Sequence, residues 1–197
     1  MFETKEYQDY VVDQVNDNLA RGYDELYLNH LKNDVLPAFD FKGAEVLDVG
    51  ARAFESWDWF RTNYEKDITG IDIGREGLDF CKEKNKTGII ELDAHRMLEK
   101  FTESQFDLVL AFHSFEHMYD LPLVLRNCFQ VLKPGGYLYF ALPYQSFNWK
   151  KGHWYDVRDD KHMLQLCTDA GFTTIHSEVI SDYKYRPEKE TLGVVRK

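Results

Sequence analysis

The sequence predicts an α/β fold in which a mostly parallel β-sheet is covered by helices on both faces. Three observations indicate this class: short runs of branched aliphatic residues recur along the chain, amphipathic helical segments separate them, and glycine or polar residues close several of the runs. Continuous apolar strands that alternate with helices are typical of a parallel sheet buried on both sides. We therefore expect a three-layer α-β-α sandwich.

The N-terminal third predicts helices followed by a β-α-β unit. From Tyr7 to Phe39, apolar residues recur at spacings of three or four, which indicates one or two helices before the sheet. The runs AEVLDVG (44–50) and DITGIDIG (67–74) indicate buried strands, and Glu55–Tyr64 between them has a helical pattern.

The rest of the chain continues this alternation and contains neither a repeat nor a domain linker. We expect a single domain over residues 1–197, with an N-terminal helical lid at 1–41 and a core at 42–197. The remaining expected elements, in order, are a helix at Glu76–Lys84, strands at 87–94 and 106–112, a helix at Pro122–Leu132, a strand at 136–143, a helix at Lys161–Ala170 ended by Gly171, and strands at 172–180 and 191–197.

The composition excludes several classes of function. A formal net charge of −10 opposes binding to nucleic acid or to an anionic membrane, because phosphate contacts need clustered Lys and Arg. The chain has no run of about 18 apolar residues and no cationic leader, so we expect a soluble, cytoplasmic protein. The cysteines, Cys81, Cys128 and Cys167, form no C-x-x-C pair and are expected to be reduced thiols.

Polar or permissive residues follow each of the first four predicted strands. Asp48 and Gly50 close the first, Asp72 the second, Asp93 the third, and His113 the fourth. Ligands of parallel sheets bind outside the carboxyl ends of the strands, where the strand order reverses. A carboxylate about 20 residues beyond a glycine turn is placed to accept both hydroxyls of a ribose, so Asp72 is the expected ribose ligand.

Five segments in order resemble the motifs of class I S-adenosylmethionine-dependent methyltransferases. They are EVLDVG, ITGIDIG, IIELDA, FDLVLAFHSFEHM and VLKPGGYLYFALP, and the similarity runs from about Ala44 to the C-terminus. The resemblance implies a Rossmann-like, seven-stranded sheet with an antiparallel last strand. It also implies S-adenosylmethionine as cofactor and methyl transfer to an oxygen or nitrogen of a small molecule.

The same resemblance implies a cofactor site. The glycine after the first strand would admit the methionine end of the cofactor, the acid after the second would hold the ribose, and residues after the third would flank the adenine. Asp48 would orient the loop or meet the amino group through water, and the backbone near Ala111 and Phe112 would meet that amino group directly. The implied positions are Asp48, Gly50, Arg52, Asp72, Ile73, Asp93, Ala94 and Phe112.

The first motif departs from the family pattern at two positions. The family carries further glycines where this chain has Arg52 and Phe54. Either Arg52 replaces the lost backbone contacts by binding the methionine carboxylate, or the side chains occlude the pocket and the protein is a catalytically inactive, methyltransferase-like binding module. A nicotinamide oxidoreductase is disfavoured, because G-x-G-x-x-G is absent after the first strand.

Two chemical roles are open for the histidines near the fourth strand. His113, or His153 in the aromatic loop beyond the fifth strand, is a candidate general base for methyl transfer. Alternatively His113, Glu116 and His117 hold a divalent metal, with His153 as a fourth ligand, although no metal is our primary expectation. Glu116 and His117 also suit the start of a helix, where they would satisfy backbone groups.

Overall fold

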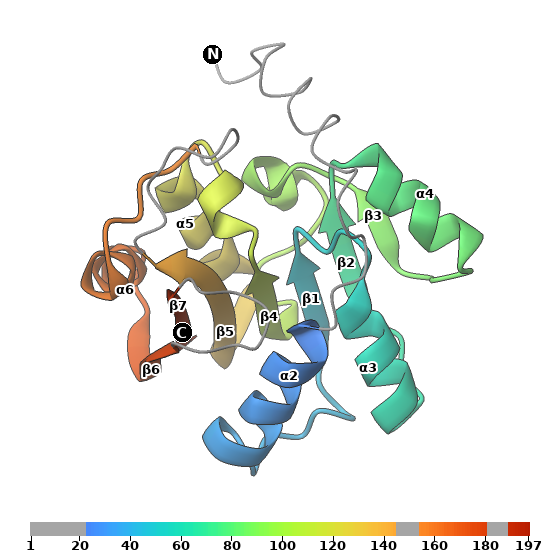
Figure 1. Ribbon diagram of the computed structural model, residues 1–197, viewed down its shortest axis with the longest axis horizontal. Coiled ribbons are helices and arrows are strands. Elements are labelled where there is room, and N and C mark those ends of the chain that lie inside the picture. Colours follow the sequence, from blue (N-terminus) through green and yellow to red (C-terminus); the bar gives the residue numbers. More distant parts are fainter. Residues whose placement is uncertain (1–22, 145–153, 181–188) are drawn as a thin grey trace.

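The computed structural model describes residues 23–144, 154–180 and 189–197, which form a seven-stranded sheet with helices on both faces (Figure 1). The strand order is β3-β2-β1-β4-β5-β7-β6. The strands are β1 (Val46–Val49), β2 (Thr69–Asp72), β3 (Ile89–Glu91), β4 (Phe106–Phe112), β5 (Leu132–Tyr144), β6 (Thr173–Ile180) and β7 (Lys189–Arg196).

The helices fill the intervals that the sequence pattern assigned to them. They are α2 (Tyr23–His30), α3 (Glu55–Tyr64), α4 (Arg75–Glu83), α5 (Leu121–Val131) and α6 (Asp160–Asp169), with a π-helical turn at Leu31–Val35 and 3-10 turns at Ala94–Glu99 and Phe115–His117. Gly171, just beyond α6, has a φ of 106°, a left-handed backbone that favours glycine at a helix end. In the described part of the chain, no helix combines the length and apolar character that a membrane crossing requires.

The sheet topology creates one switch point, between β1 and β4. β1 pairs in parallel with β2 on one side and with β4 on the other, so the chain runs outward to β3 and then returns across the sheet. β7 runs antiparallel to both β5 and β6. The predicted fold class is therefore confirmed, including the antiparallel last strand. A ligand site is expected at the carboxyl ends of β1 and β4.

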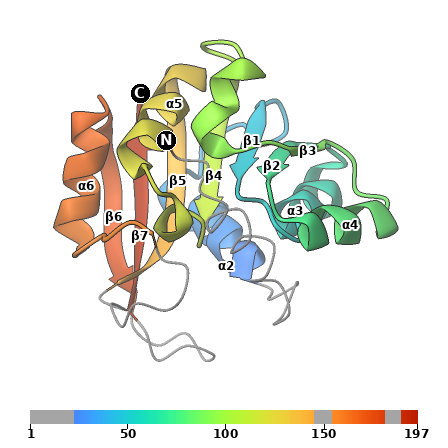
Figure 2. The same cartoon turned by 90° about the horizontal axis from the view of Figure 1, so that it is seen from above.

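Both faces of the sheet are buried, which explains the continuous apolar strands. Leu108 and Leu110 of β4 pack on the face covered by α2 and α3, whereas Val109 packs with Leu138 on the face covered by α5 (Figure 2). Side chains of a strand point alternately to opposite faces, so one apolar run serves two cores. All three cysteines are buried and none is in a disulfide.

Only part of the segment expected to form an N-terminal lid is described. The range 1–22 lies outside the described residues, and the remainder of the expected lid contains α2, which packs against α3.

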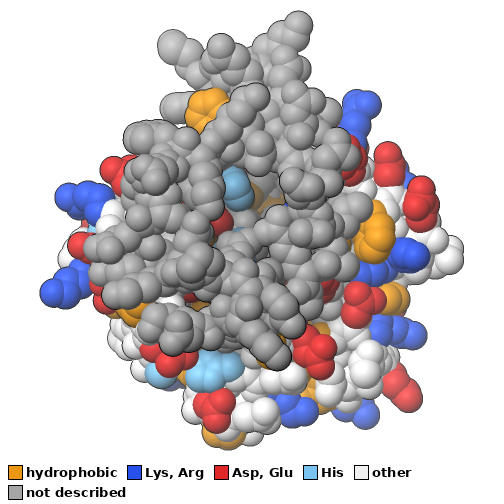
Figure 3. Space-filling view, in the orientation of Figure 1, with side chains coloured by type: hydrophobic (Ala, Val, Ile, Leu, Met, Phe, Trp, Pro, Cys, Tyr) orange, Lys and Arg blue, Asp and Glu red, His pale blue; other side chains and the backbone are white. Residues whose placement is uncertain are grey.

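On the face shown in Figure 3, acidic and basic side chains alternate around the rim, and the described atoms form no continuous basic surface there.

Candidate cofactor and catalytic site

The loop after β1 keeps a glycine-like backbone although two of its residues are not glycine. Gly50 has a φ of 75°, and Arg52 and Phe54 have φ values of 46° and 55°. A left-handed conformation costs a non-glycine residue about 1–2 kcal/mol. The loop therefore keeps the left-handed turns that glycine favours, and surrounding contacts must hold it in place.

Three neighbouring groups hold this loop. The Arg52 N–H donates to Asp72 Oδ2 at 2.7 Å. The Lys86 ammonium, almost buried, donates to the carbonyl of Phe54 at 3.2 Å and to that of the preceding residue at 2.7 Å. A Cβ on Gly77 of α4 would lie 2.8 Å from the Arg52 carbonyl oxygen, so only glycine lets the helix and the loop approach this closely.

The Phe54 side chain belongs to the core. It is fully buried in the cluster on the α2 and α3 face of the sheet. A Cβ on Gly70 of β2 would lie 2.7 Å from the Phe54 ring, so the ring occupies the space that this glycine leaves open. Arg52, in contrast, is partly exposed. Of the two substituted positions, only Arg52 thus keeps a side chain that solvent reaches.

Asp48 is buried behind the loop and fixes the start of α3. Its carboxylate accepts a short hydrogen bond from the Ser56 hydroxyl, while the Ser56 N–H donates to Asp24 at 3.2 Å. Burial raises the pKa of Asp48 to about 7, although the Ser56 bond opposes this and the charges of Asp72 and Glu55 reinforce it. The hydrogen bond from Ser56 suits the predicted role of Asp48 in orienting the loop.

Asp72 lies at the carboxyl end of β2, beside the loop. Its two oxygens accept from the N–H groups of Arg52 at 2.7 Å and Gly74 at 2.6 Å. Burial raises the pKa of Asp72, and these bonds together with the Arg52 charge work against that rise. An ionised carboxylate has about four acceptor sites, so each oxygen retains capacity for a ribose hydroxyl. The neighbouring Ile73 is partly exposed.

The end of β3 contains a fully paired histidine that sequence analysis missed. His95 Nδ1 lies 2.6 Å from Asp93, and His95 Nε2 accepts from the Asp120 N–H at 3.2 Å, so the ring proton is on Nδ1. The His95 ring stacks on Tyr119 at 3.6 Å. Burial would raise the pKa of Asp93, but the bonds from His95 lower it overall. Ala94, which follows Asp93, is buried.

His113 ends β4 in a left-handed backbone with a φ of 50°. Its Nε2 lies 2.8 Å from the Tyr27 hydroxyl and 3.4 Å from Glu190 Oε1. The Tyr27 hydroxyl donates to the other Glu190 oxygen at 2.5 Å. Helix α2 and strand β7 thus bring Tyr27 and Glu190 to the predicted base. Phe112 is buried, and its ring centroid lies 5.1 Å from that of Tyr27.

Glu116 is a buried carboxylate on the other side of His113. It lies 3.7 Å from His113 Nδ1 and 3.9 Å from His117 Nε2. Burial would raise the pKa of Glu116, yet the hydrogen bond from His113 and the charges of both histidines lower it to about 2. The Glu116 carbonyl accepts from the Trp154 N–H at 3.0 Å, which ties in the segment before α6.

Backbone packing brings the loops after β1 and β4 into contact. A Cβ on Gly50 would lie 2.4 Å from the Cβ of Ser114, so this glycine is required at the crossing whatever ligand binds. Within the described residues, the donor atoms of His113, Glu116 and His117 do not form a three-residue metal cluster. His153 lies outside the described residues, so its predicted role stays a prediction.

Comparison with known proteins shows similarity to methyltransferases. Residues 47–140 match a family model described as a methyltransferase domain. The structure resembles that of the cyclase SpnF, with a TM-score of 0.72 and 18% identity over 88% of this chain and 81% of that one. It also resembles an S-adenosylmethionine-dependent methyltransferase from Methanosarcina mazei, with a TM-score of 0.67 and 18% identity over 83% and 97% of the two chains.

Among curated proteins, the chain is similar to methyltransferases that act on nitrogen or on oxygen. The chain is 27% identical over 166 residues to phosphoethanolamine N-methyltransferase 1 of Triticum aestivum, covering 79% of this chain and 33% of the relative. It is 29% identical over 118 residues to the ubiquinone biosynthesis O-methyltransferase of Proteus mirabilis, covering 57% and 46%. The chain thus spans between a third and a half of these relatives. The resemblance to class I S-adenosylmethionine-dependent methyltransferases is confirmed in the family model and the fold.

Proposed function

We propose that this chain is an S-adenosylmethionine-dependent methyltransferase that transfers a methyl group to an oxygen or nitrogen of a small molecule. The observation that carries the proposal is the loop after β1. It retains left-handed turns at Arg52 and Phe54, and the Phe54 ring is directed into the core rather than over the strand ends. The match over residues 47–140 and the relatives that methylate nitrogen or oxygen support the same class.

The residues around the switch point fit the cofactor chemically. The Asp72 carboxylate has acceptor capacity for the ribose hydroxyls, and the Arg52 guanidinium supplies a fork for the methionine carboxylate. Asp93 is held ionised by His95 near the adenine end. When bound, the cofactor supplies an electrophilic methyl group on a sulfonium. The chain contributes positioning, which accounts for much of the rate when two reactants are held in line.

His113 is the group that takes the acceptor's proton in this proposal. Its imidazole lies between Glu116 and Glu190, two buried carboxylates from the segments after β4 and at β7. A base becomes cationic when it accepts a proton, and nearby carboxylates stabilise that cation. Tyr27 bridges His113 to Glu190 and so fixes the ring orientation.

An inactive, methyltransferase-like binding module is the alternative. This alternative requires the side chains of Arg52 and Phe54 to close the cofactor site. Phe54 is buried in the core, which argues that its side chain does not close the site. Isothermal titration with S-adenosylmethionine and its demethylated product distinguishes the two. Measurable binding of both supports the enzyme, whereas a folded wild-type protein that binds neither supports the module.

Asp72→Ala tests the assignment of the ribose. Loss of a bidentate carboxylate contact should weaken cofactor binding by about 1–3 kcal/mol, or roughly 5-fold to 150-fold. Asp72 also accepts two backbone N–H groups, so circular dichroism and thermal unfolding must show that the variant is folded. Asp79→Ala, at an exposed acid on α4, is the matched control. Equal affinity in a folded Asp72→Ala protein would remove the ribose assignment.

A further inference from the structure

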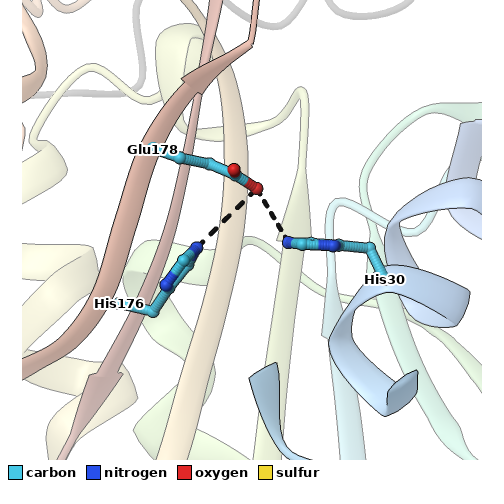
Figure 4. A group of neighbouring side chains, drawn as sticks. All are labelled: His30, His176 and Glu178. Carbon is cyan, nitrogen blue, oxygen red and sulfur yellow. Dashed lines mark ion pairs between the residues drawn. The ribbon is translucent and has the colours of Figure 1, made fainter. Parts of the chain in front are cut away.

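A second group of ligand-type side chains lies away from the switch point. His30 at the end of α2 and His176 and Glu178 of β6 bring one donor atom each within 4.8 Å of one another (Figure 4). His30 Nε2 lies 2.7 Å from Glu178 Oε1, and His176 Nε2 lies 3.7 Å from the same oxygen. In the region between α2 and β6, Figure 3 shows histidine side chains beside acidic ones.

Secondary structure explains why these groups meet. His176 and Glu178 are two residues apart on a strand, so they point to the same face of the sheet. His30 approaches that face from α2, at the opposite end of the sequence (Figure 4). The two histidine Nε2 atoms are buried and make no hydrogen bond, although the side chains as a whole are partly exposed. Two inaccessible imidazole nitrogens thus face one carboxylate oxygen.

We propose that His30, His176 and Glu178 bind a zinc ion. Zinc takes imidazole nitrogen and carboxylate oxygen at about 2.0–2.2 Å in tetrahedral geometry, which places ligand atoms about 3.3 Å apart. The distance between His30 and Glu178 must lengthen from 2.7 Å and that between His176 and Glu178 must shorten from 3.7 Å. These changes are about 0.6 Å and 0.4 Å from the 2.7 Å and 3.7 Å distances, a size that side-chain rotation can supply. Two imidazoles favour zinc over magnesium or calcium.

The contact of His30 with Asp34 supports this assignment. His30 Nδ1 lies 3.0 Å from Asp34 Oδ2, one turn further along the helix. A carboxylate on the second nitrogen of a metal-binding histidine fixes the tautomer and orients the ring. Zinc would replace any proton on His30 Nε2, so binding releases protons and weakens as the pH falls. Three protein ligands leave the fourth position to water.

Zinc at this place would fasten α2 to the edge strand. The same helix carries Tyr27, whose hydroxyl contacts His113 and Glu190 in the candidate catalytic site. A metal ion that bridges α2 and β6 would therefore limit movement of the helix that supplies Tyr27. The inference is independent of methyl transfer, because it concerns binding of the metal itself.

Zinc binding can be measured directly on the full chain, with any affinity tag removed and metal stripped by a chelator that is then dialysed away. Competition against a chromophoric zinc chelator should show one equivalent bound per chain. His30→Ala and His176→Ala should each weaken binding by at least about tenfold, and Asp34→Asn by about tenfold. His162→Ala, at a partly buried histidine on α6, should leave the affinity unchanged.

Two further readouts separate a specific site from misfolding or adventitious binding. Cobalt substitution should give the visible absorption of a four-coordinate ion in the wild type and lose it in His176→Ala. Zinc should raise the thermal midpoint of the wild type but not that of His176→Ala, with circular dichroism confirming that both are folded. The proposal is wrong if the wild type fails to bind one equivalent, or if His30→Ala and His176→Ala retain wild-type affinity.

Discussion

Replacing Arg52 and Phe54 with glycine, one at a time, should have opposite effects on stability. Both residues have a left-handed φ, so glycine relieves about 1–2 kcal/mol at either position. Glycine also loses more freedom on folding, which costs about 0.5–1 kcal/mol. Arg52 is partly exposed and its N–H bond to Asp72 survives, so Arg52→Gly should stabilise the protein by up to about 1.5 kcal/mol.

Phe54→Gly differs because its ring is fully buried against Gly70. Removing a buried phenylalanine side chain costs about 3–5 kcal/mol in lost burial and cavity formation. After relief of the backbone, a net loss of about 2–4 kcal/mol remains. Equilibrium urea denaturation measures both changes in the free energy of unfolding, provided that the m value, the slope of that free energy against urea concentration, is the same for each variant.

The affinity of Arg52→Gly for S-adenosylmethionine is measured alongside its stability. If the Arg52 guanidinium binds the methionine carboxylate, Arg52→Gly should weaken S-adenosylmethionine binding about tenfold, or about 1.4 kcal/mol, while stability is maintained. Tighter binding would mean that the side chain occludes the site, and unchanged binding would mean that it does neither. If Arg52→Gly and Phe54→Gly lose equal stability, the strained-loop reasoning is refuted.

Two other predictions concern ionisable groups near the site, Asp48 and His113. Burial raises the pKa of Asp48 from 3.8 to about 7. Between about pH 4 and pH 7 the unfolded chain ionises this carboxyl while the folded protein keeps it protonated, so stability falls progressively as the pH rises through this window. Asp48→Asn should therefore be more stable than the wild type at pH 8, on the order of 2–4 kcal/mol, and lose that advantage at pH 4 in urea titrations. For His113, methyl transfer to an identified acceptor should survive chelation and fall at least about 100-fold in His113→Gln. Loss of activity on chelation with recovery on adding metal would instead favour the hypothesis that His113, Glu116 and His117 bind an ion.

Local pattern was sufficient for most of the fold. The helix Glu55–Tyr64 and the strand 106–112 have the predicted bounds, because each is an uninterrupted periodic or apolar run. β5 begins at Leu132, four residues before the predicted strand at 136–143. The segment Lys133–Gly136 resembles a turn, and the pairing register shifts between Phe106 and Leu108 where it joins the sheet.

The site was predictable only where a residue follows a strand. Asp48 and Asp72 were assigned from their positions at strand ends, and the structure places both beside the loop after β1. Tyr27 and Glu190 were missed as partners of His113, because they are separated by 163 residues and meet only through the packing of α2 on the sheet. His95 has a local signal, since it follows Asp93 by two residues, but its stacking partner Tyr119 does not.

The fold alone does not decide the chemistry, because SpnF, a cyclase, shares it with methyltransferases. Two of the histidines that follow the strands, His95 and His113, differ in their surroundings. His95 has both ring nitrogens paired at 2.6 Å and 3.2 Å, which suits a structural role. His113 also contacts the Tyr27 hydroxyl at 2.8 Å, but its backbone is strained and two buried carboxylates lie 3.4 Å and 3.7 Å from its ring. Strain of this kind persists where a site requires it. If proton transfer occurs where these strands end, His113 rather than His95 is therefore the residue that carries the proton.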